Sequence, residues 1–392
     1  MTVRVNKPSF NIREKLSELG RKFGLKGSEL AAAETVQEAR DVVSAGRKNM
    51  IINGAMQVAQ RVAYPSTQPS VSYSNYYTVD RWRMNISDAH FGTWTFSQSN
   101  TVPSGKGFAY SWKWDCQATD TSLSSDHYGI AEYRIEAQDL QHLGYGTSSA
   151  KPITLSFWVK TNKTGTYVFS IYANDGARYV TKTYTVNQAN TWEYKTITFE
   201  GDISGTINND NGDGFRLWWW LGSGTGYTGG TMQPGVWRPW SESNGAAPGL
   251  SVNMADSTSN EWFITGVQME VGRNATEFEH RPYGEEFALC QRYCQSFDGR
   301  IAIGNWTGAT GALVVRHLSP PMRIAPSIHS YTAGRCLVEA VAWYTVGNVT
   351  IQSETRNTSV AFQLNSVANS GQSVNANAMW GNRASVVLQA EL

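Results

Sequence analysis

Two different hydrophobic patterns divide this sequence at about residue 48. Before that point, apolar residues recur every three or four positions, the spacing that places side chains on one face of a helix. One stripe consists of Ile12, Leu16, Leu19 and Phe23, and a second consists of Leu30, Ala33, Val36, Ala39 and Val43. Ser28 can cap the second helix and Gly46 can end it. The sequence therefore predicts two short amphipathic helices within residues 1–48.

These two predicted helices cannot bury their apolar stripes alone. Neither carries the three or four heptads that an independent coiled coil needs. The stripes must therefore pack against each other, against another copy or against another protein. We interpret residues 1–48 as an attachment segment whose docking residues are Ile12, Leu16, Leu19, Phe23, Leu30, Val36 and Val43. The alternative is a helical cap folded onto the domain that follows.

From residue 49 onward, apolar and polar residues alternate with a period of two. The clearest runs cover residues 153–159, 166–172, 192–199, 215–221 and 262–270, with Gly, Asn or Asp between them. This period is typical of strands that bury one face. About eight such strands predict a jelly-roll-like β-sandwich over residues 49–282.

A helical pattern returns after the sandwich. Its apolar positions lie three or four apart and are followed by Gly299, which predicts a linking helix over residues 283–298. The residues that carry this pattern are Phe287, Cys290, Tyr293 and Cys294. Short alternating runs then predict a small C-terminal β domain over residues 299–392. The expected fold is mainly β, with a short α-helical segment at the N-terminus.

Charge and composition restrict the partners. Lys and Arg total 33 and Asp and Glu total 32 among 392 residues, so the net charge of +1 gives no global field that would attract nucleic acid or an anionic membrane. No run of about 18 apolar residues is present, and the first residues lack the apolar region of a secretory signal. We expect neither nucleic-acid binding nor membrane insertion.

The motifs of common enzyme classes are missing from the sequence. It contains no GxSxG, no HExxH and no phosphate loop, and its histidines are not spaced as metal ligands. Four cysteines form no CxxC pair, and we expect buried thiols. The predictions are no catalytic residue, no cofactor and no metal. A calcium site at Asp210, Asn211 and Asp213 stays open, although a loop of this composition is usually a solvated turn.

Tryptophan-rich segments offer candidate ligand sites, because indole faces stack on the C–H surfaces of sugars in many β-sandwiches. Since Trp218 and Trp220 point to one face of a strand and Trp219 to the other, at least one of these sets should lie in the core. Burial between copies competes for the aromatic residues of the terminal domain. The receptor-binding candidates are Trp306, Arg335, Trp343, Tyr344, Trp380, Trp219, Trp237 and Trp240.

Three segments carry a resemblance to a known class of proteins. They are RKNMIINGAMQVAQR at residues 47–61, YTVDRW at residues 77–82, and GVQMEVGRNATEFEHRPYGEE at residues 266–286, which runs into LCQRY at residues 289–293. Together they resemble tail-fibre or fibre-like virion structural proteins of tailed bacteriophages, especially marine short-tailed phages. The resemblance covers roughly residues 49–297, and the helical start is similar to the docking segment of such fibres. Cys294 replaces the second Tyr that usually follows Gln-Arg-Tyr.

This resemblance implies a homotrimer in the virion, assembled in the host cytoplasm. Its N-terminus would dock onto other phage tail or capsid proteins, and its distal β domain would bind a host cell-surface glycan. One alternative is a purely structural fibre that decorates the capsid or tail. The other is a glycan depolymerase, which would need two carboxyl groups about 5 to 10 Å apart across a cleft.

The motif residues themselves suggest structural roles. Asn53-Gly54 is a natural turn, and we expect Asp80 and Arg81 to form an ion pair beside the buried ring of Trp82. Charged residues of the closing motif should form salt bridges around the junction of the two β domains. They are Glu277, Glu279, Arg281, Glu285 and Glu286.

Overall fold

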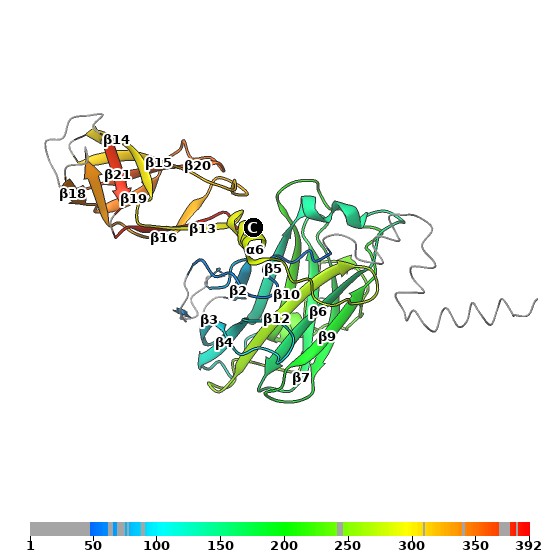
Figure 1. Cartoon of the computed structure of the whole chain (residues 1–392). Helices are drawn as coiled ribbons and strands as arrows, with labels where there is room; N and C mark the ends of the chain where they lie inside the picture. The colour runs from blue at the N-terminus through cyan, green and yellow to red at the C-terminus, as the bar shows by residue number, and fades with distance from the viewer. Residues whose placement is uncertain are drawn as a thin grey trace, which may run out of the picture.

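A computed structural model describes most of the chain after residue 47. The described residues are 48–61, 66–68, 75–76, 78–87, 91–240, 246–308, 310–338, 342–367, 377–381 and 383–392. The two predicted N-terminal helices, with the docking residues from Ile12 to Val43, lie outside this part. The expected mainly β fold is confirmed, because nearly all regular elements are strands in antiparallel sheets (Figure 1).

Two six-stranded antiparallel sheets form the body. Sheet I has the order β1 (Ser66–Gln68), β3 (Thr93–Ser99), β4 (Ser111–Ala118), β12 (Glu261–Val271), β6 (Ile153–Thr161) and β9 (Glu193–Phe199). Sheet II has the order β11 (Arg238–Pro239), β8 (Arg178–Val186), β7 (Gly165–Ala173), β10 (Asp213–Ser223), β5 (Tyr128–Glu136) and β2 (Trp82–Ile86). A 3-10 helix, η1 (Ala137–Leu143), and a single turn, α4 (Thr225–Thr228), complete the body.

One hydrophobic core lies between the two sheets. Every second residue of β6, from Ile153 to Val159, is fully buried, as the alternating pattern predicts. Trp219 of β10 lies in this core, with its ring centroid 5.9 Å from that of Phe157 in sheet I and 4.7 Å from that of Phe169 in sheet II. The five strands predicted in this region are confirmed as β6, β7, β9, β10 and β12.

The terminal domain has a second core enclosed by a curled half-barrel. Its seven-stranded sheet has the order β18 (Ala342–Thr345), β17 (Arg335–Val338), β21 (Asn377–Gly381), β14 (Ala302–Gly308), β15 (Gly311–His317), β20 (Ser359–Asn365) and β19 (Asn348–Ile351). A three-stranded sheet has the order β13 (Cys294–Asp298), β22 (Ser385–Gln389) and β16 (Ser327–Thr332). Both sheets contribute buried side chains to the same core.

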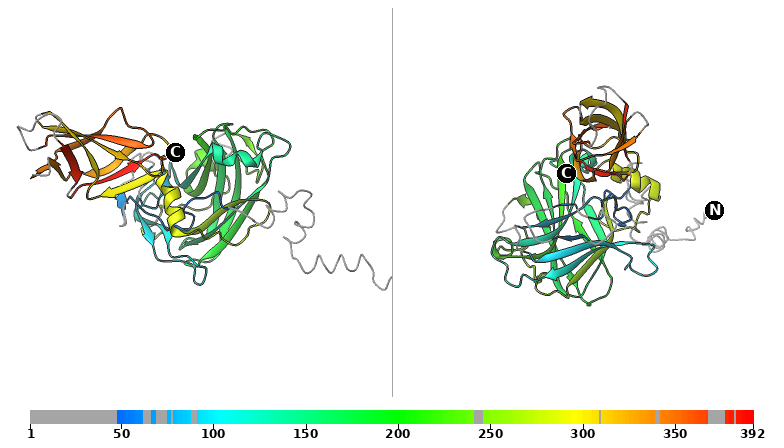
Figure 2. Two further views of the ribbon diagram at one scale, coloured as in Figure 1. Left: turned by 45° about the horizontal axis from the view of Figure 1, so that its top comes forward. Right: turned by 90° about the vertical axis from the view of Figure 1, so that its left-hand side faces the viewer.

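The linking helix is shorter than predicted. It is α6 (Tyr283–Gln291), and Figures 1 and 2 show it at the joint between the body and the terminal domain. The prediction of helix as far as residue 298 is wrong, because Cys294–Asp298 forms β13 and pairs with β22. Spacings of three and four cannot distinguish one more helical turn from a strand that has a partner far along the chain. Only that partner, next to the C-terminus, decides the conformation.

The opening motif folds around the side chain of Asn53, which has a positive φ of 59° in a tight turn. Its Nδ2 donates to the carbonyl oxygens of Val58 (2.8 Å) and Asp80 (2.9 Å). Trp82 Nε1 in turn donates to the Asn53 carbonyl oxygen (3.1 Å). The first two motifs, separate in sequence, therefore form one buried unit.

Asp80 and Arg81 do not form the ion pair that we predicted from their proximity in the sequence. Asp80 binds Arg61, with Nη1 3.3 Å from Oδ1, and Arg81 binds Glu391 near the C-terminus. Both residues lie in a turn in which Arg81 has a positive φ of 74°, so the two side chains leave the backbone in different directions and reach different partners.

The closing motif holds the start of the described chain. Glu279 accepts hydrogen bonds from the backbone N–H groups of Lys48 (2.9 Å) and Asn49 (2.7 Å). Arg281 lies 3.6 Å from Glu279 and 3.4 Å from Glu286, so two of the predicted salt bridges are confirmed. All three motifs therefore meet near α6, and their observed contacts are structural.

A network of buried charges joins the two domains. Glu391 of the terminal domain binds both Arg61 (2.6 Å) and Arg81 of the body. The Arg81 guanidinium also lies 3.5 Å from the ring centroid of Tyr293, and Arg292 binds Glu136 (2.7 Å). Burial raises the pKa of Glu391, but the two guanidinium groups outweigh it and hold that pKa below its ordinary value.

Candidate functional site

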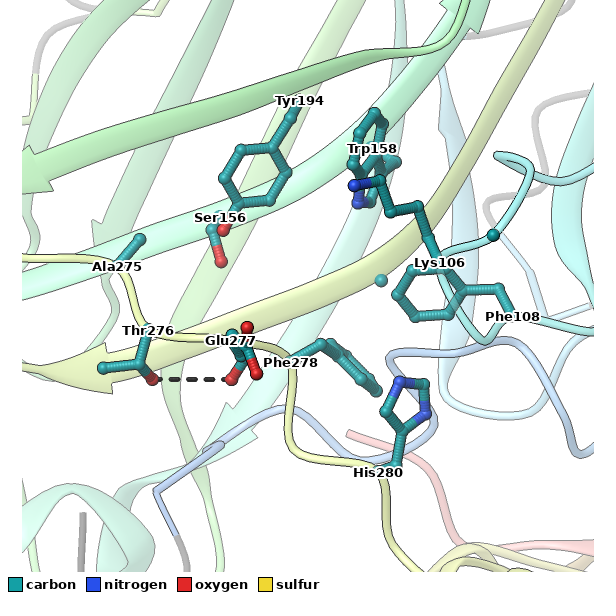
Figure 3. Close-up of a pocket in the computed structure, with 12 residues that line it drawn as sticks. Lys106, Phe108, Ser156, Trp158, Tyr194, Ala275, Thr276, Glu277, Phe278 and His280 are labelled. Atoms are coloured by element: carbon teal, nitrogen blue, oxygen red, sulfur yellow. Dashed lines mark hydrogen bonds between the residues drawn. The ribbon is translucent and has the colours of Figure 1, made fainter. Parts of the chain in front are cut away.

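A groove of about 550 Å³ lies on the outer face of sheet I (Figure 3). Its floor comes from β6, β9 and the middle of β12. One wall is a strap, residues 275–280, that follows β12, and the other is a loop, residues 105–108, that precedes β4. The groove therefore joins segments from four distant parts of the sequence.

Two aromatic rings form the floor. Since the inward residues of β6 are the apolar ones, Trp158 must point outward together with Ser156 and Lys160. Strand pairing places Trp158 opposite Tyr194 of β9, and their ring centroids lie 5.2 Å apart at an angle of 45°. Tyr194 is 43% exposed and Trp158 is partly buried. Both rings line the groove (Figure 3).

The strap is held against the sheet by two buried polar side chains of β12. Glu270 Oε1 accepts from the Thr276 backbone N–H (2.7 Å), and its Oε2 accepts from the Thr276 hydroxyl (2.7 Å). Gln268 Oε1 accepts from the Glu279 backbone N–H (2.8 Å). Buried polar groups are stable only when they are paired, so the Gln-x-Glu of the closing motif fixes one wall of the groove.

We predict that Glu270→Ala releases the strap. The change leaves Thr276 and its backbone N–H without their acceptors, which costs about 1–3 kcal/mol. Amide hydrogen exchange over residues 275–280 should become at least tenfold faster, while exchange in β5 and β10 should not change. Equal protection of the strap in Glu270→Ala and the unmodified chain would contradict this role for the carboxylate.

An aromatic cluster closes one end of the groove. Phe108 of the loop packs against Phe278 (centroids 5.1 Å apart) and His280 (5.3 Å) of the strap. Gly266 of β12 lies under Phe108 with a φ of 61°, and a Cβ there would lie 2.5 Å from the ring. The absence of a side chain at Gly266 therefore lets the loop approach the sheet.

Polar and charged groups surround the aromatic floor. The Lys106 ammonium lies 5.6 Å from the centroid of the Trp158 ring, and the Glu277 side chain is exposed on the strap. Burial raises the pKa of Tyr194, so its hydroxyl is protonated at neutral pH and can donate a hydrogen bond. This arrangement of flat apolar faces beside donors and acceptors suits a ligand that has both C–H faces and hydroxyl groups.

Three of the predicted receptor residues are in the cores instead. Trp219, Trp306 and Trp380 are all 0% exposed, so none presents a face to a ligand in this structure. Trp306 and Trp380 lie on the inward side of β14 and β21. In a domain this small, the largest side chains are the ones that fill the core.

Trp237 and Trp240 are partly buried and pack against sheet II. Trp237 Nε1 donates to the Glu200 carbonyl oxygen (2.7 Å), and Trp240 lies 5.1 Å from Tyr172 between ring centroids. Neither residue lines the groove of sheet I.

The remaining receptor candidates lie on two paired strands of the terminal domain. Arg335 in β17 is exposed, and Tyr344 in β18 packs against the terminal core. The side chain of Trp343 lies outside the described residues. The structure does not bring these three positions to the groove on the body.

Sequence reasoning missed Trp158, Tyr194 and Lys106. A usable signal was present, because Trp158 occupies the polar register of a strand whose other register is Ile, Leu, Phe and Val. Tyr194 likewise shares its register with Thr196 and Thr198. A large ring among outward Ser and Thr residues marks a surface platform. The contribution of Lys106 depends on a long-range loop contact that no local pattern contains.

The acidic loop considered for calcium has protein partners. Asp213 binds Arg216 (2.6 Å) and Arg134 (3.2 Å), and Asn211 Nδ2 donates to the Arg323 carbonyl oxygen of the terminal domain (3.1 Å). Asp210 Oδ1 accepts from the Gly212 backbone N–H (2.8 Å). In the part of the chain that the structure describes, no three His, Cys, Asp or Glu side chains are grouped as metal ligands. This loop contacts the terminal domain.

The structure also bears on the cysteines and on membrane insertion. All four cysteines are buried free thiols. Among the described residues, no helix is both long enough and apolar enough to span a bilayer.

No protein-family model and no curated protein matches this chain. It has distant structural similarity to the enzymatically active domain of tailspike protein 4 of bacteriophage CBA120, at 11% identity and a TM-score of 0.28, over 57% of this chain and 21% of that one. A putative sugar-binding protein from Bacteroides thetaiotaomicron aligns at 11% identity and a TM-score of 0.31, over 57% of this chain and 100% of that one. A family 11 carbohydrate-binding module from Clostridium thermocellum, in complex with a β-1,3-1,4-mixed-linked tetrasaccharide, aligns at 13% identity and a TM-score of 0.24, over 55% and 100%.

Proposed function

We propose that this chain binds saccharides through the groove on sheet I. The observation that carries the proposal is the pair of outward rings, Trp158 and Tyr194, inside a rim of hydroxyl, carboxylate and ammonium groups. Apolar rings that line an open groove cost free energy in water unless a partner covers them. Sugar rings meet both requirements of this surface, since their C–H faces cover the aromatic rings and their hydroxyl groups bond to the rim.

We further propose that the protein is a virion fibre protein of the tailed-phage type, with a jelly-roll-like body. The motif segments at residues 47–61, 77–82 and 266–286 support this assignment, since they resemble the fibre proteins. In this proposal, residues 1–48 attach a homotrimer to tail or capsid proteins of the particle, and the protein has no enzymatic activity. The host glycan would be bound on the body rather than on the terminal domain, where the main candidates, Trp306 and Trp380, are buried.

A purely structural fibre is the second candidate function. It is favoured by the dense contacts among the three motifs and by the buried ion pairs at the joint, because these features stiffen the molecule. A structural fibre does not need exposed rings in a groove. The two functions therefore differ in the effect of changing Trp158 or Tyr194.

We expect Trp158→Ala and Tyr194→Ala each to weaken glycan binding about tenfold, equivalent to about 1.4 kcal/mol. Tyr331→Ala, which removes a similarly exposed ring (41%) from the terminal domain, is the matched control and should bind normally. Retention of the full chain in affinity gels that contain purified bacterial surface polysaccharides provides the measurement.

The outcomes separate the functions clearly. If the wild-type chain is retained and both groove variants are retained equally well, the groove is not the binding site. No retention of the wild-type chain on any polysaccharide would favour the structural fibre. Shortening of the polysaccharide chains during incubation would instead indicate a depolymerase.

A further inference from the structure

Two lysines beside the groove lack an acidic partner. Within the described residues, no carboxylate lies within ion-pair distance of Lys106 or Lys160. The Lys106 ammonium lies over the Trp158 ring, 5.6 Å from its centroid, and the Lys160 ammonium lies 5.2 Å from the centroid of Phe263. Lys113, which lies over the same Phe263 ring, is instead bound to Asp115 (3.1 Å) and Glu261 (2.5 Å). The first two charges therefore remain available to a ligand.

The register of sheet I places Lys160 on the same outward face as Trp158, the ring that the Lys106 ammonium approaches. Trp158 and Lys160 are alternate residues of β6, so both face outward, and such positions are about 7 Å apart along a strand. That step is comparable to the length of one sugar unit in an extended polysaccharide. Tyr194 lies across the strands from Trp158, whereas Lys160 lies along β6. A sugar unit stacked on the Trp158–Tyr194 pair would therefore have Lys106 beside it, and a next unit that follows β6 would lie near Lys160.

The acidic group of the groove lies on the wall opposite Lys106. Figure 3 shows Glu277 on the strap beside Thr276, whereas Lys106 projects from the opposite loop toward Trp158. The Lys48 ammonium donates to the Glu277 carbonyl oxygen (2.6 Å), so a positive charge also lies next to the strap. Among the described residues, Lys106 is thus a cation at the aromatic floor without a carboxylate partner, and the lining carboxylate, Glu277, lies on the other wall.

We propose that the groove selects acidic saccharides, whose carboxylate or sulfate groups bind Lys106 and Lys160 while the sugar rings stack on Trp158 and Tyr194. This inference rests on the proposed saccharide binding and narrows it to one chemical class. The protein as a whole has a net charge of only +1, so general attraction to polyanions cannot supply the selectivity.

The test compares matched acidic and neutral polymers. Alginate is paired with carboxyl-reduced alginate, and dextran sulfate with dextran. The full chain should bind at least one acidic polymer at least tenfold more tightly than its neutral counterpart. That preference should decline as salt rises from about 50 to 500 mM, because exposed charge pairs are screened.

Three variants locate the preference. The double variant Lys106→Gln/Lys160→Gln should lose the acidic preference, and Trp158→Ala should lose binding to the acidic polymer as well. Lys163→Gln is the matched control, because that lysine, near the end of β6, is already bound to Asp256. It should keep the preference of the unmodified chain.

Any other result contradicts either the charge selectivity or the location of the site. Equal binding of neutral and acidic polymers, or an unchanged preference in the double variant, overturns the charge selectivity and leaves saccharide binding intact. An acidic preference that Trp158→Ala does not reduce places the polyanion outside the groove and overturns the inference. Failure of the unmodified chain to bind any of the four polymers contradicts the inference directly. The polysaccharide panel described above then shows whether saccharide binding fails with it.

Discussion

Replacing Trp219 with alanine should destabilise the body by about 3–5 kcal/mol, the range for removing a large aromatic side chain from a packed core. The ring is fully buried and contacts both sheets, with Trp82 (5.4 Å between centroids) and Phe169 (4.7 Å) on one side and Phe157 (5.9 Å) on the other. Its loss leaves a cavity that neither sheet can close, because the strands on both sides are fixed by their ladders.

Urea unfolding of the full chain, followed by near-UV circular dichroism, measures this effect. Trp240→Ala provides a matched control, since it also removes an indole from a sheet II cluster but from a partly exposed position. It should cost less than half as much. If Trp219→Ala and Trp240→Ala shift the midpoint equally, then Trp219 does not carry the contact between the sheets.

The predicted and observed positions of Trp219 show what alternation along a strand can and cannot establish. From the sequence, Trp218 and Trp220 share one face of β10 and Trp219 takes the other, which the structure confirms. The pattern does not say which face is the core, because both registers of this strand are aromatic. The core is decided by partners such as Phe157, sixty-two positions earlier in the sequence, and local patterns contain no information about such partners.

For β6 the sequence was sufficient to assign both faces. From Ile153 to Val159 its inward register is entirely aliphatic or phenyl, and its outward register is Thr, Ser, Trp and Lys, so the outward position of the Trp158 ring follows from the sequence alone. The groove around Trp158 does not follow from the sequence. The strap depends on Glu270 and Gln268, and Lys106 comes from a loop more than fifty residues earlier, which packs against the strap through the contacts of Phe108.

The same division explains the errors at the domain joint. Ion pairing between Asp80 and Arg81 was inferred from adjacency, whereas the structure pairs them with Arg61 and Glu391. Helical spacing over Cys290 and Cys294 was inferred without knowledge of β22, which converts Cys294–Asp298 into a strand. The partner of Arg81 and the partner strand of β13 both lie near the C-terminus, while Arg61 lies nineteen positions before Asp80. Chain topology brings each of these partners close.

The second large effect is expected at this joint, where Glu391→Ala should cost about 3–5 kcal/mol. The change leaves Arg61 and Arg81 buried without their shared carboxylate, and both side chains are almost completely inaccessible to water. Arg61 keeps its contact with Asp80 (3.3 Å), so most of the cost comes from the uncompensated buried charge of Arg81 rather than from the loss of one attraction. Glu354→Ala, which removes an exposed carboxylate from the same domain, should have no measurable effect.

Acid should weaken the same joint. The pKa of Glu391 in the folded protein is lower than in the unfolded chain, so its ionisation stabilises the fold above an unfolded value of about 4.3. That contribution is lost as the pH falls through the lower, folded pKa. Burial raises the pKa of Glu136, but hydrogen bonds from Arg292 and Tyr293 outweigh this effect and hold the pKa below its ordinary value. Glu136 therefore changes stability with pH in the same direction as Glu391. Burial raises the pKa of Asp80, and this opposes part of the loss.

Limited proteolysis at the segment between α6 and β13 reports on the joint directly, because a protease needs the two domains to separate there. The unmodified chain should resist cleavage at pH 7 and become susceptible below about pH 4, where carboxylates of ordinary pKa take up protons. Glu391→Ala should already be susceptible at pH 7, and Glu354→Ala should follow the unmodified chain. Resistance of Glu391→Ala at pH 7, together with an unchanged unfolding midpoint, would show that the strand ladders rather than the buried charges hold the terminal domain against the body.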